Sequence, residues 1–466
     1  MKRFIAFIAA VAPIAAGALI IGILIMGIAR PFEAEGLGKD DQGVVSDAVV
    51  NSPTPEPVAA SPLPPSGFAP QTRLGYTAGD QWEPAIATDK LGNVYMLYPQ
   101  YGGVPGCRQC ASPTMVLQIS RDGGATWGAP QPIGGSRDGQ WDAQMEVDPV
   151  DGTTVYAAWL QAQRSAIAVA RSTDSGNTWS VVVPPNARDE TDKPILAVRG
   201  QDVYVAFDVR NEQRLSASHD GGLTFTTATV ANKKTTWALA GGGVVAPNGD
   251  VFFGWAGYAF GWAESAVNLF ITRSTDGGQT WTILPIARSS AAPACPPDYG
   301  CGWAFLGAQM AMAADDGGAV YALWNAGQAR KGPQRIYFSR SDDSGDTWSA
   351  PADVSTAADG VEHAFPAIVA GAANDVHIAW MDSRAGDWWN THFRASTDGG
   401  QTWTGEVDLS TYVPGYQYIQ PDGFRFPFGD YFEMSIDAGG LTHAVWGEGH
   451  NYDSPGSIWY SRGNAP

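Results

Sequence analysis

The sequence predicts an all-β protein whose folded part is a seven-bladed β-propeller, with a six-bladed ring as the alternative, preceded by an N-terminal transmembrane helix and a disordered stalk. Three observations lead to this prediction. An octapeptide of the pattern S-x-D-x-G-x-T-W, once ending in Phe, occurs six times, and a pattern of paired short strands occurs seven times. The chain also has 56 Gly and 18 Trp among its 466 residues, which is typical of turn-rich, aromatic-packed sheets.

Residues 1–30 are expected to form a transmembrane signal anchor. The stretch from Phe4 to Ile28 carries no charge, and at ~1.5 Å per residue it is long enough to cross a ~30 Å hydrocarbon core. Lys2 and Arg3 precede it and acidic residues follow it, so the remainder of the chain should lie outside the cytoplasm of a single-pass cell-membrane protein. A cleaved signal peptide, with its small-residue site at Gly27 to Ala29, is the alternative.

Residues 31–66 are expected to form a linker. The segment is rich in Pro, Ala, Ser and acidic residues and includes "NSPTPEPVAASPLPPSG". It lacks the apolar content needed for a core, and its prolines favour an extended chain. We therefore expect a semi-rigid stalk, with the propeller over residues 67–466.

The four cysteines form two close pairs, Cys107 with Cys110 and Cys295 with Cys301. In an exported protein, such pairs in Gly/Pro-rich loops are typical of local disulfides. A zinc site built from all four is the alternative, although no histidine lies beside them. A redox CxxC is disfavoured because no βαβ pattern surrounds it.

Each octapeptide has the composition of a tight hairpin. A strand-like segment precedes it, its Asp can cap turn N–H groups, its Gly can take a positive φ, and its Thr and aromatic residue re-enter a strand. We expect the aromatic residue to pack between neighbouring sheets. The six aspartates are therefore given structural roles: Asp122, Asp174, Asp220, Asp276, Asp343 and Asp398.

The second pattern is a small-residue strand, a Gly/Asp/Asn turn and an aromatic-rich strand. Its seven copies begin at Glu83, Asp142, Asp192, Gly243, Gln309, Phe365 and Tyr431. Four short antiparallel strands per copy, repeated around an axis, form a propeller. The seventh copy has no octapeptide after "SIWYSRG", so we expect residues 67–76 to supply its outer strand and close the ring.

At these motifs the chain resembles the sialidase superfamily of Asp-box propellers, over about Gln81 to the C-terminus. The resemblance implies that the boxes join the third and fourth strands of each blade, on the face away from the ligand. For a true sialidase it would further imply three arginines that clamp a substrate carboxylate, a Tyr nucleophile partnered by Glu, and an Asp acid/base. The chain departs from this pattern at Gln81 to Pro84, "QWEP", where Trp82 stands in the place of a clamp arginine.

The candidate catalytic residues are Glu83, Asp142, Asp192 and Tyr431. Aligning the seven copies places them at the starts of inner strands, on one rim of the axial channel. Carboxylates that repel one another in a concave site have raised pKa values, as a general acid requires. The alternative is that they accept backbone N–H groups at the channel mouth.

The candidate ligand-binding residues lie near the same rim. They are Arg210, Arg384, Arg425, Asp208, Asp382, Trp82 and Trp141. An arginine can grip a ligand carboxylate with two hydrogen bonds, and aromatic faces stack on sugar rings. The alternative is that each arginine pairs with its neighbouring aspartate and each Trp belongs to the core.

The net charge of −19 disfavours nucleic acid as a partner. Two functions stay open: a surface-displayed module that binds a glycan or another exported protein, and an exo-acting glycoside hydrolase of the sialidase type (exo-α-sialidase). The departure at Trp82 and the acidic charge favour the first. A third, an assembly factor for a membrane complex, is permitted by the anchor. No cofactor or metal is required by any ligand cluster, although calcium could sit among the rim carboxylates, and we expect a monomer.

Overall fold

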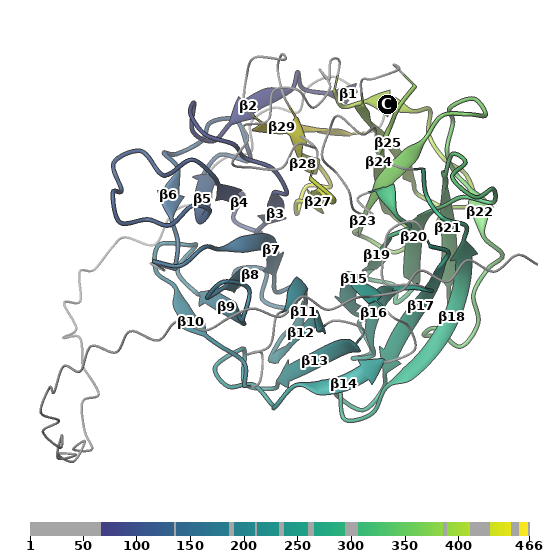
Figure 1. Ribbon diagram of the computed structural model, residues 1–466, viewed down its shortest axis with the longest axis horizontal. Coiled ribbons are helices and arrows are strands. Elements are labelled where there is room, and N and C mark those ends of the chain that lie inside the picture. The colour runs from purple at the N-terminus through teal and green to yellow at the C-terminus, as the bar shows by residue number, and fades with distance from the viewer. Residues whose placement is uncertain are drawn as a thin grey trace, which may run out of the picture. The chain divides into compact units, whose positions relative to one another are not determined.

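A computed structural model describes residues 67–134, 137–185, 191–209, 212–232, 237–259, 265–293, 306–384, 389–410, 429–448 and 456–464. These residues form seven antiparallel sheets arranged as blades around an axis (Figure 1). The predicted all-β, seven-bladed propeller is confirmed, and the six-bladed alternative is wrong.

Each blade runs outward from the axis in chain order. Blade 1 contains β3 (Ala85–Thr88), β4 (Val94–Gln100), β5 (Thr114–Ser120) and β6 (Gln131–Pro132). Blade 2 contains β7 (Trp141–Val147), β8 (Val155–Gln161), β9 (Ala166–Ser172) and β10 (Ser180–Val182). Blade 3 contains β11 (Asp192–Arg199), β12 (Asp202–Val209), β13 (Glu212–Ser218) and β14 (Thr229–Asn232). Blade 4 contains β15 (Trp237–Val245), β16 (Val251–Tyr258), β17 (Val267–Ser274) and β18 (Thr282–Ser289).

The remaining blades follow the same order, except at the last outer strand. Blade 5 contains β19 (Met310–Ala314), β20 (Val320–Ala326), β21 (Arg335–Ser341) and β22 (Ala352–Asp353). Blade 6 contains β23 (His363–Ala370), β24 (Val376–Asp382), β25 (Asn390–Ser396) and β26 (Val407–Asp408). Blade 7 contains β27 (Glu433–Ile436), β28 (Thr442–Glu448) and β29 (Ser457–Asn464), together with β1 (Gly67–Phe68) and β2 (Thr72–Leu74).

Blade 7 closes the ring with strands from both ends of the propeller. Both β1 and β2 pair antiparallel with β29, with Phe68 opposite Gly463 and Arg73 opposite Trp459. The ring of Phe68 also packs edge-on against Phe393 of blade 6, at 4.8 Å between centroids. The expectation that residues 67–76 supply the missing outer strand is confirmed, and this pairing covers the edge that β29 would otherwise expose.

The six octapeptides form the same turn in blades 1 to 6. In the first copy, the Asp122 carboxylate accepts the Thr126 N–H at 2.8 Å and the Thr126 hydroxyl at 2.6 Å, while the Ser120 Oγ accepts the Gly124 N–H. The other five copies repeat these contacts. The Gly123 N–H donates to Gly92, in the turn that follows the inner strand. The octapeptides therefore lie at the end of the ring opposite the inner-strand starts.

Aromatic side chains pack between the blades, as expected from the octapeptides. Trp127 contacts Tyr460 of blade 7 edge-on at 5.0 Å, and Trp403 of blade 6 contacts Phe338 of blade 5 at 5.1 Å. The largest fully buried side chains on the second strands include Trp159, Trp324 and Trp446. The apolar clusters they join combine residues from adjacent blades, so each sheet is stabilised mainly by its neighbours.

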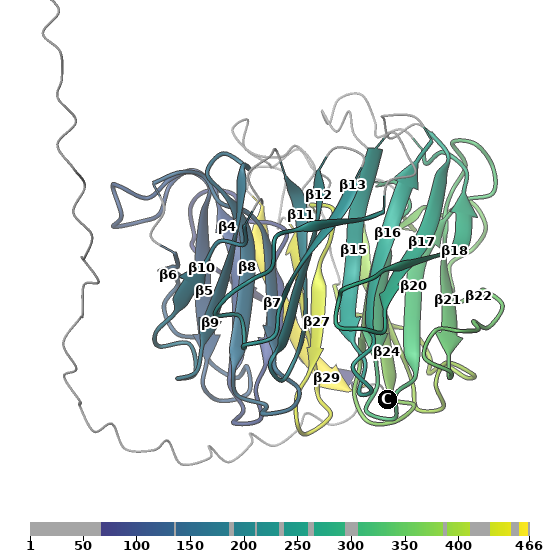
Figure 2. The ribbon, with the colours of Figure 1, turned by 90° about the horizontal axis from the view of Figure 1, so that it is seen from below.

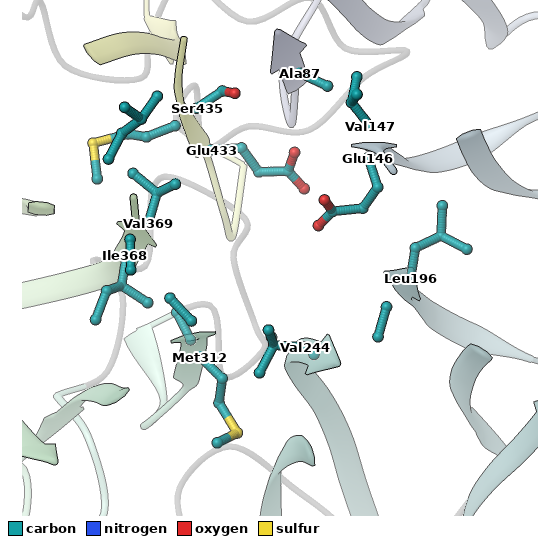
Figure 3. A pocket seen from close by; sticks show the side chains of 18 of the residues that line it. Ala87, Glu146, Val147, Leu196, Val244, Met312, Ile368, Val369, Glu433 and Ser435 are labelled. Atoms are coloured by element: carbon teal, nitrogen blue, oxygen red, sulfur yellow. The ribbon is translucent and has the colours of Figure 1, made fainter. Parts of the chain in front are cut away.

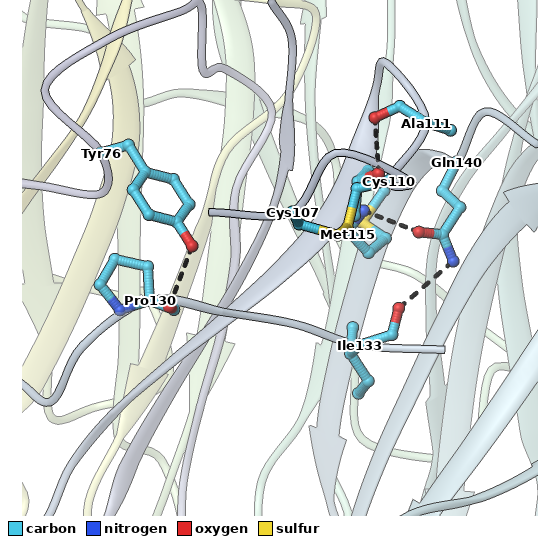
Figure 4. Close-up of a disulfide and its surroundings, with 9 residues drawn as sticks. Tyr76, Cys107, Cys110, Ala111, Met115, Pro130, Ile133 and Gln140 are labelled. Atoms are coloured by element: carbon cyan, nitrogen blue, oxygen red, sulfur yellow. Dashed lines mark hydrogen bonds between the residues drawn. A yellow bond between two sulfur atoms is a disulfide. The ribbon is translucent and has the colours of Figure 1, made fainter. Parts of the chain in front are cut away.

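Cys107 and Cys110 form a disulfide in the loop between β4 and β5, as predicted (Figure 4). Both pack with Tyr76 against the cluster that joins blades 1 and 7. This bond removes two of the four thiols from the zinc alternative. Cys295 and Cys301 lie outside the described residues.

The predictions for the anchor at residues 1–30 and the stalk at residues 31–66 also fall outside the described residues. Within the ranges given above, no helix has the length and apolar character needed to span a membrane.

Figure 2 shows the propeller from the side, with the inner strands β7, β11, β15 and β27 running along the axis. Inner strands from all seven blades line an axial channel of about 690 Å³. The starts of these strands form one end of the channel, which we call the mouth.

Candidate functional site

The inner strands enter the sheet through a local irregularity at the mouth. The pairing register shifts between Trp141 and Gln144 in β7, between Asp192 and Ile195 in β11, and between Ala364 and Ala367 in β23. Non-glycine residues with φ near +50° mark the same place: Glu83, Asp142, Lys193 and Phe365. A left-handed residue in a bulge turns its side chain out of the regular alternation, so these positions can present side chains to the mouth.

The register shows which residues are equivalent. In each blade the second strand carries a similar run of residues, such as Val94–Leu97 in β4 and Thr442–Val445 in β28. The fourth residue of this run pairs with an inner-strand residue, as Leu97 does with Ala85 and Val445 with Glu433. The equivalent mouth position lies two residues before that inner-strand residue. The equivalent residues are Glu83, Asp142, Lys193, Gln309, Phe365 and Tyr431. The predicted alignment is confirmed in five blades and wrong by one residue in blade 3, where Lys193 rather than Asp192 occupies the position.

Lys193 lies at the centre of the mouth, although it is not among the site residues predicted from the sequence. Its ammonium pairs with the carboxylate of Asp430 and lies 4.4 Å from the centroid of the Tyr431 ring. Burial lowers the pKa of Lys193, but the carboxylates of Asp430, Glu83 and Asp142 outweigh burial and raise it. Lys193 therefore stays charged and joins blade 3 to blade 7. The shared X-Pro pairs Glu83-Pro84, Lys193-Pro194 and Phe365-Pro366 were the signal that could have found it.

Glu83 and Asp142 both accept backbone N–H groups from neighbouring blades. Glu83 Oε1 accepts the Asp430 N–H at 3.1 Å, and Asp142 Oδ2 accepts the Lys193 N–H at 3.3 Å. The alternative interpretation of these acids is thus confirmed for both. Burial, helped by the charges of Asp430 and Asp142, raises the pKa of Glu83 well above its usual range. Burial and the charge of Asp192 raise the pKa of Asp142 to about 7. Both acids therefore have pKa values well above that of an ordinary carboxyl group.

Asp192 and Asp208 differ in their exposure to solvent. They are opposite one another in the pairing of β11 with β12. Asp192 is partly exposed, and Arg164 approaches it at 3.8 Å. Asp208 is buried and accepts the Ala240 N–H. Burial raises the pKa of both carboxyls, and only Asp192 can meet a ligand directly.

Tyr431 is brought to the mouth as expected, but its hydroxyl is engaged. It donates to the carbonyl of Ala143 in blade 2 at 3.1 Å. Burial and the negative charges of Glu83 and Asp142 raise the pKa of Tyr431 well above its usual range. Its proton is therefore held more firmly than in water, which is unfavourable for a nucleophile.

Arg384 and Asp382 do not join this group. The guanidinium of Arg384 binds Asp382, with Nη2 to Oδ2 at 2.6 Å, and also binds Glu406. Asp382 is fully buried and receives the Trp380 indole N–H at 3.1 Å. Local pairing, the alternative interpretation of Arg384, is confirmed. Arg210 and Arg425 lie outside the described residues.

The two tryptophans of the predicted site have different environments. Trp82 is 1% exposed and stacks on Tyr101, with ring centroids 4.6 Å apart, so it belongs to the core. Trp141 remains partly exposed at the start of β7 and packs on the cluster between blades 2 and 3. Of these two side chains, Trp141 is the one that can offer a face to a ligand at the mouth.

One group in the described residues has the composition of a metal site. His392, Glu406 and Asp408 lie together on blade 6, with ligand atoms within 4.8 Å of one another. Arg384 already binds Glu406, and the His392 Nδ1 lies 2.9 Å from Asp408. A metal ion at this place would therefore have to displace Arg384 from Glu406 and His392 from Asp408.

No protein-family model and no curated protein sequence matches this chain. Among solved structures, an ulvan lyase, from a new family of polysaccharide lyase, aligns with a TM-score of 0.52 and 13% identity over 84% of this chain and 95% of its own. A protein of unknown function from Dyadobacter fermentans has a TM-score of 0.49 and 15% identity, over 85% and 98%. An intramolecular trans-sialidase from Ruminococcus gnavus has a TM-score of 0.44 and 13% identity, over 84% and 97%. The ulvan lyase likeness shows a shared fold alone. The seven sheets make the chain a seven-bladed β-propeller, and the solved structures that align with it include sialidases.

Proposed function

We propose that this chain is a membrane-anchored, extracytoplasmic propeller that binds an exported carbohydrate at the mouth of its channel. In this proposal residues 1–30 are the anchor, residues 31–66 are the stalk, and the six octapeptide turns are Asp boxes of the sialidase superfamily. One observation carries the proposal. Glu83, Asp142, Asp192 and Tyr431 come from four blades and gather at the mouth around Lys193 and Asp430.

The mouth offers a sugar both acceptors and an apolar face. Asp142 and Asp192 are partly exposed, and carboxylate oxygens accept hydrogen bonds from sugar hydroxyls. Trp141 lies at the start of the same inner strand as Asp142 and keeps part of its surface exposed. An aromatic face beside convergent polar groups is a common arrangement in ligand sites.

The charges at the mouth favour a neutral sugar over an anionic one. Lys193 is paired with Asp430, and Arg164 lies against Asp192. Arg384 is held by Asp382 and Glu406. Among the described residues, the mouth therefore has four acids, Glu83, Asp142, Asp192 and Asp430, and two cations, Lys193 and Arg164, which already contact acids. Neither cation is left to pair with the carboxylate of a sialic acid.

The alternative is an exo-acting glycoside hydrolase of the sialidase type, and the pKa of Asp142 favours it. A carboxyl with a pKa of about 7 can act as a general acid at neutral pH. If Tyr431 were the nucleophile, a base would have to take its proton, and Glu83 would be the glutamate in that role. The raised pKa of Tyr431 and its bond to Ala143 argue against this role, so we prefer binding without turnover.

The test uses the full-length protein in detergent, on a glycan array and against fluorogenic sialosides and other glycosides. Binding of neutral glycans without turnover, lost in Asp142→Asn and kept in the matched Asp276→Asn, is the expected result. Turnover abolished by Tyr431→Phe would establish the hydrolase instead. If the protein showed no binding and no turnover, the proposal would be overturned.

A further inference from the structure

Two glutamates face one another inside the channel, below the mouth. Glu146 belongs to β7 of blade 2 and Glu433 to β27 of blade 7, and their carboxyl groups point toward each other across the lumen (Figure 3). Blade 1 lies between them and lines this part of the channel with Ile86, Ala87 and Thr88 of β3. The carboxyl of Glu433 reaches in front of this strand, where it accepts the backbone N–H of Ile86.

Their hydrogen bonds are unequal. Glu433 Oε2 accepts the Ile86 N–H at 3.1 Å, and its Oε1 accepts the Gln144 amide at 2.8 Å. The carboxyl of Glu146 has no hydrogen-bond or ion-pair partner in the residues that the structure describes. Burial raises the pKa of Glu146 to about 8, and burial together with Glu146 raises that of Glu433.

In the described residues no cation forms an ion pair with either acid. Three cations of the described chain line the channel. Lys193, near the mouth, binds Asp430, and Lys90, at the far end, binds the carbonyl of Asp151. Arg199 ends β11 at that far end as well. Two neighbouring carboxyl groups without a cation beside them favour a state in which at least one is protonated, and a cation that approaches them favours their ionisation. The channel therefore has a position where a positively charged hydrogen-bond donor would gain two acceptors.

The opposite wall of the channel is apolar. Figure 3 shows Leu196, Val244, Met312, Ile368 and Val369 around the lumen facing the two acids. They come from the inner strands of blades 3 to 6. The volume of about 690 Å³ falls in the range of small-molecule sites, which are mostly apolar with a few polar groups that set orientation.

We propose that the channel is a second binding site, for a primary amine with an apolar chain. The ammonium group would donate to Glu146 and Glu433, and the apolar chain would lie against Val244, Ile368 and Val369, which are partly exposed to the channel. An ammonium group favours the ionised form of both carboxyl groups and donates to them, which an alcohol does less and a carboxylate does not. The apolar wall selects an alkyl chain over a bare metal ion. This site lies below the mouth and uses none of the residues proposed for carbohydrate binding.

The first test is calorimetric titration of the full-length protein with n-hexylamine, n-hexanol, hexanoate and calcium chloride. Hydrogen bonds to charged groups are worth ~1.5–3 kcal/mol, so hexylamine should bind about tenfold or more tightly than hexanol, and hexanoate should not bind. Glu146→Gln should weaken hexylamine by a similar factor. Glu362 is the matched control, because it is a buried glutamate outside the channel lining and its pKa is also raised, to about 7. Glu362→Gln should leave the affinity for hexylamine unchanged.

Equal binding of hexanol and hexylamine, calcium that displaces hexylamine, or unchanged affinity in Glu146→Gln would each overturn the proposal. A second measurement needs no variant. With methionine methyl groups labelled, NMR should show a shift of Met312, which faces the channel, when hexylamine is added. Met96, which is 0% exposed in the core of blade 1, should not shift. A spectrum in which Met312 does not move at saturating hexylamine contradicts the site.

Discussion

On the face of the ring that carries the octapeptides, each aspartate accepts hydrogen bonds from its own turn, whereas at the mouth the acids depend on neighbouring blades. Thr and Ser donors lower the pKa of Asp220, Asp276 and Asp398 to about 2. Burial and like charges raise the pKa of Asp142 to about 7. The same residue type is thus held ionised on one face and pushed toward protonation on the other.

The difference follows from repetition. The octapeptide is nearly identical in six blades, and its contacts are local, so every copy has the same structure. At the mouth the equivalent positions hold Glu83, Asp142, Lys193, Phe365 and Tyr431. Repeated positions stabilise the fold, and the varied ones give the mouth its chemistry.

The largest expected effect comes from breaking the scaffold. Deleting residues 67–74 removes β1 and β2 and exposes the edge of β29. We expect the melting temperature to fall by about 10 °C or more, because several kcal/mol of pairing and packing are lost. Differential scanning calorimetry measures this, and deletion of the equally long linker segment 55–62 is the matched control. An unchanged melt in the 67–74 deletion would show that the ring does not need these strands.

The next largest effect is expected from removing the cation at the mouth. Lys193→Met keeps a long side chain but leaves Asp430, Glu83 and Asp142 without their cation. Removing one partner of a buried ion pair costs about 3–5 kcal/mol, which urea unfolding at pH 7 can measure. The double variant Lys193→Met/Asp430→Asn should recover part of this loss. If the single variant is as stable as the parent, Lys193 does not hold the mouth together.

The fold could be read largely from the sequence because its signals are local. The octapeptide at Ser274, for example, contains every donor and acceptor of its turn. The closing strand could be predicted from the missing octapeptide of blade 7. The pairing of Arg384 with Asp382, only two residues away, was likewise open to inference.

The site could be read only in part because its contacts are long-range. Apolar alignment could not distinguish Asp192 from Lys193, since both precede the same hydrophobic run and only the backbone bulge separates them. The pairing of Lys193 with Asp430 joins residues 237 positions apart. Glu146 and Glu433 belong to inner strands of different blades, and they face one another only in the folded ring.

The division between the two faces can be tested directly by the unfolding free energy of Asp142→Asn and Asp276→Asn in urea at pH 5 and pH 8. Asn tolerates the left-handed backbone of Asp142, φ 56°. An unfolded Asp has a pKa of about 3.9. The folded pKa of Asp142 is higher, about 7, so its ionisation destabilises the protein progressively as pH rises from about 4 to 7. The folded pKa of Asp276 is lower, about 2, so its stabilisation is present at both pH values and is lost only as pH falls through about 2.

We predict that Asp142→Asn is more stable than the parent at pH 8, with a smaller gain at pH 5, and that Asp276→Asn is less stable than the parent at both. If Asp142→Asn lost stability at pH 8 as Asp276→Asn does, the acids of the mouth would be structural like those of the turns, and the division would be wrong.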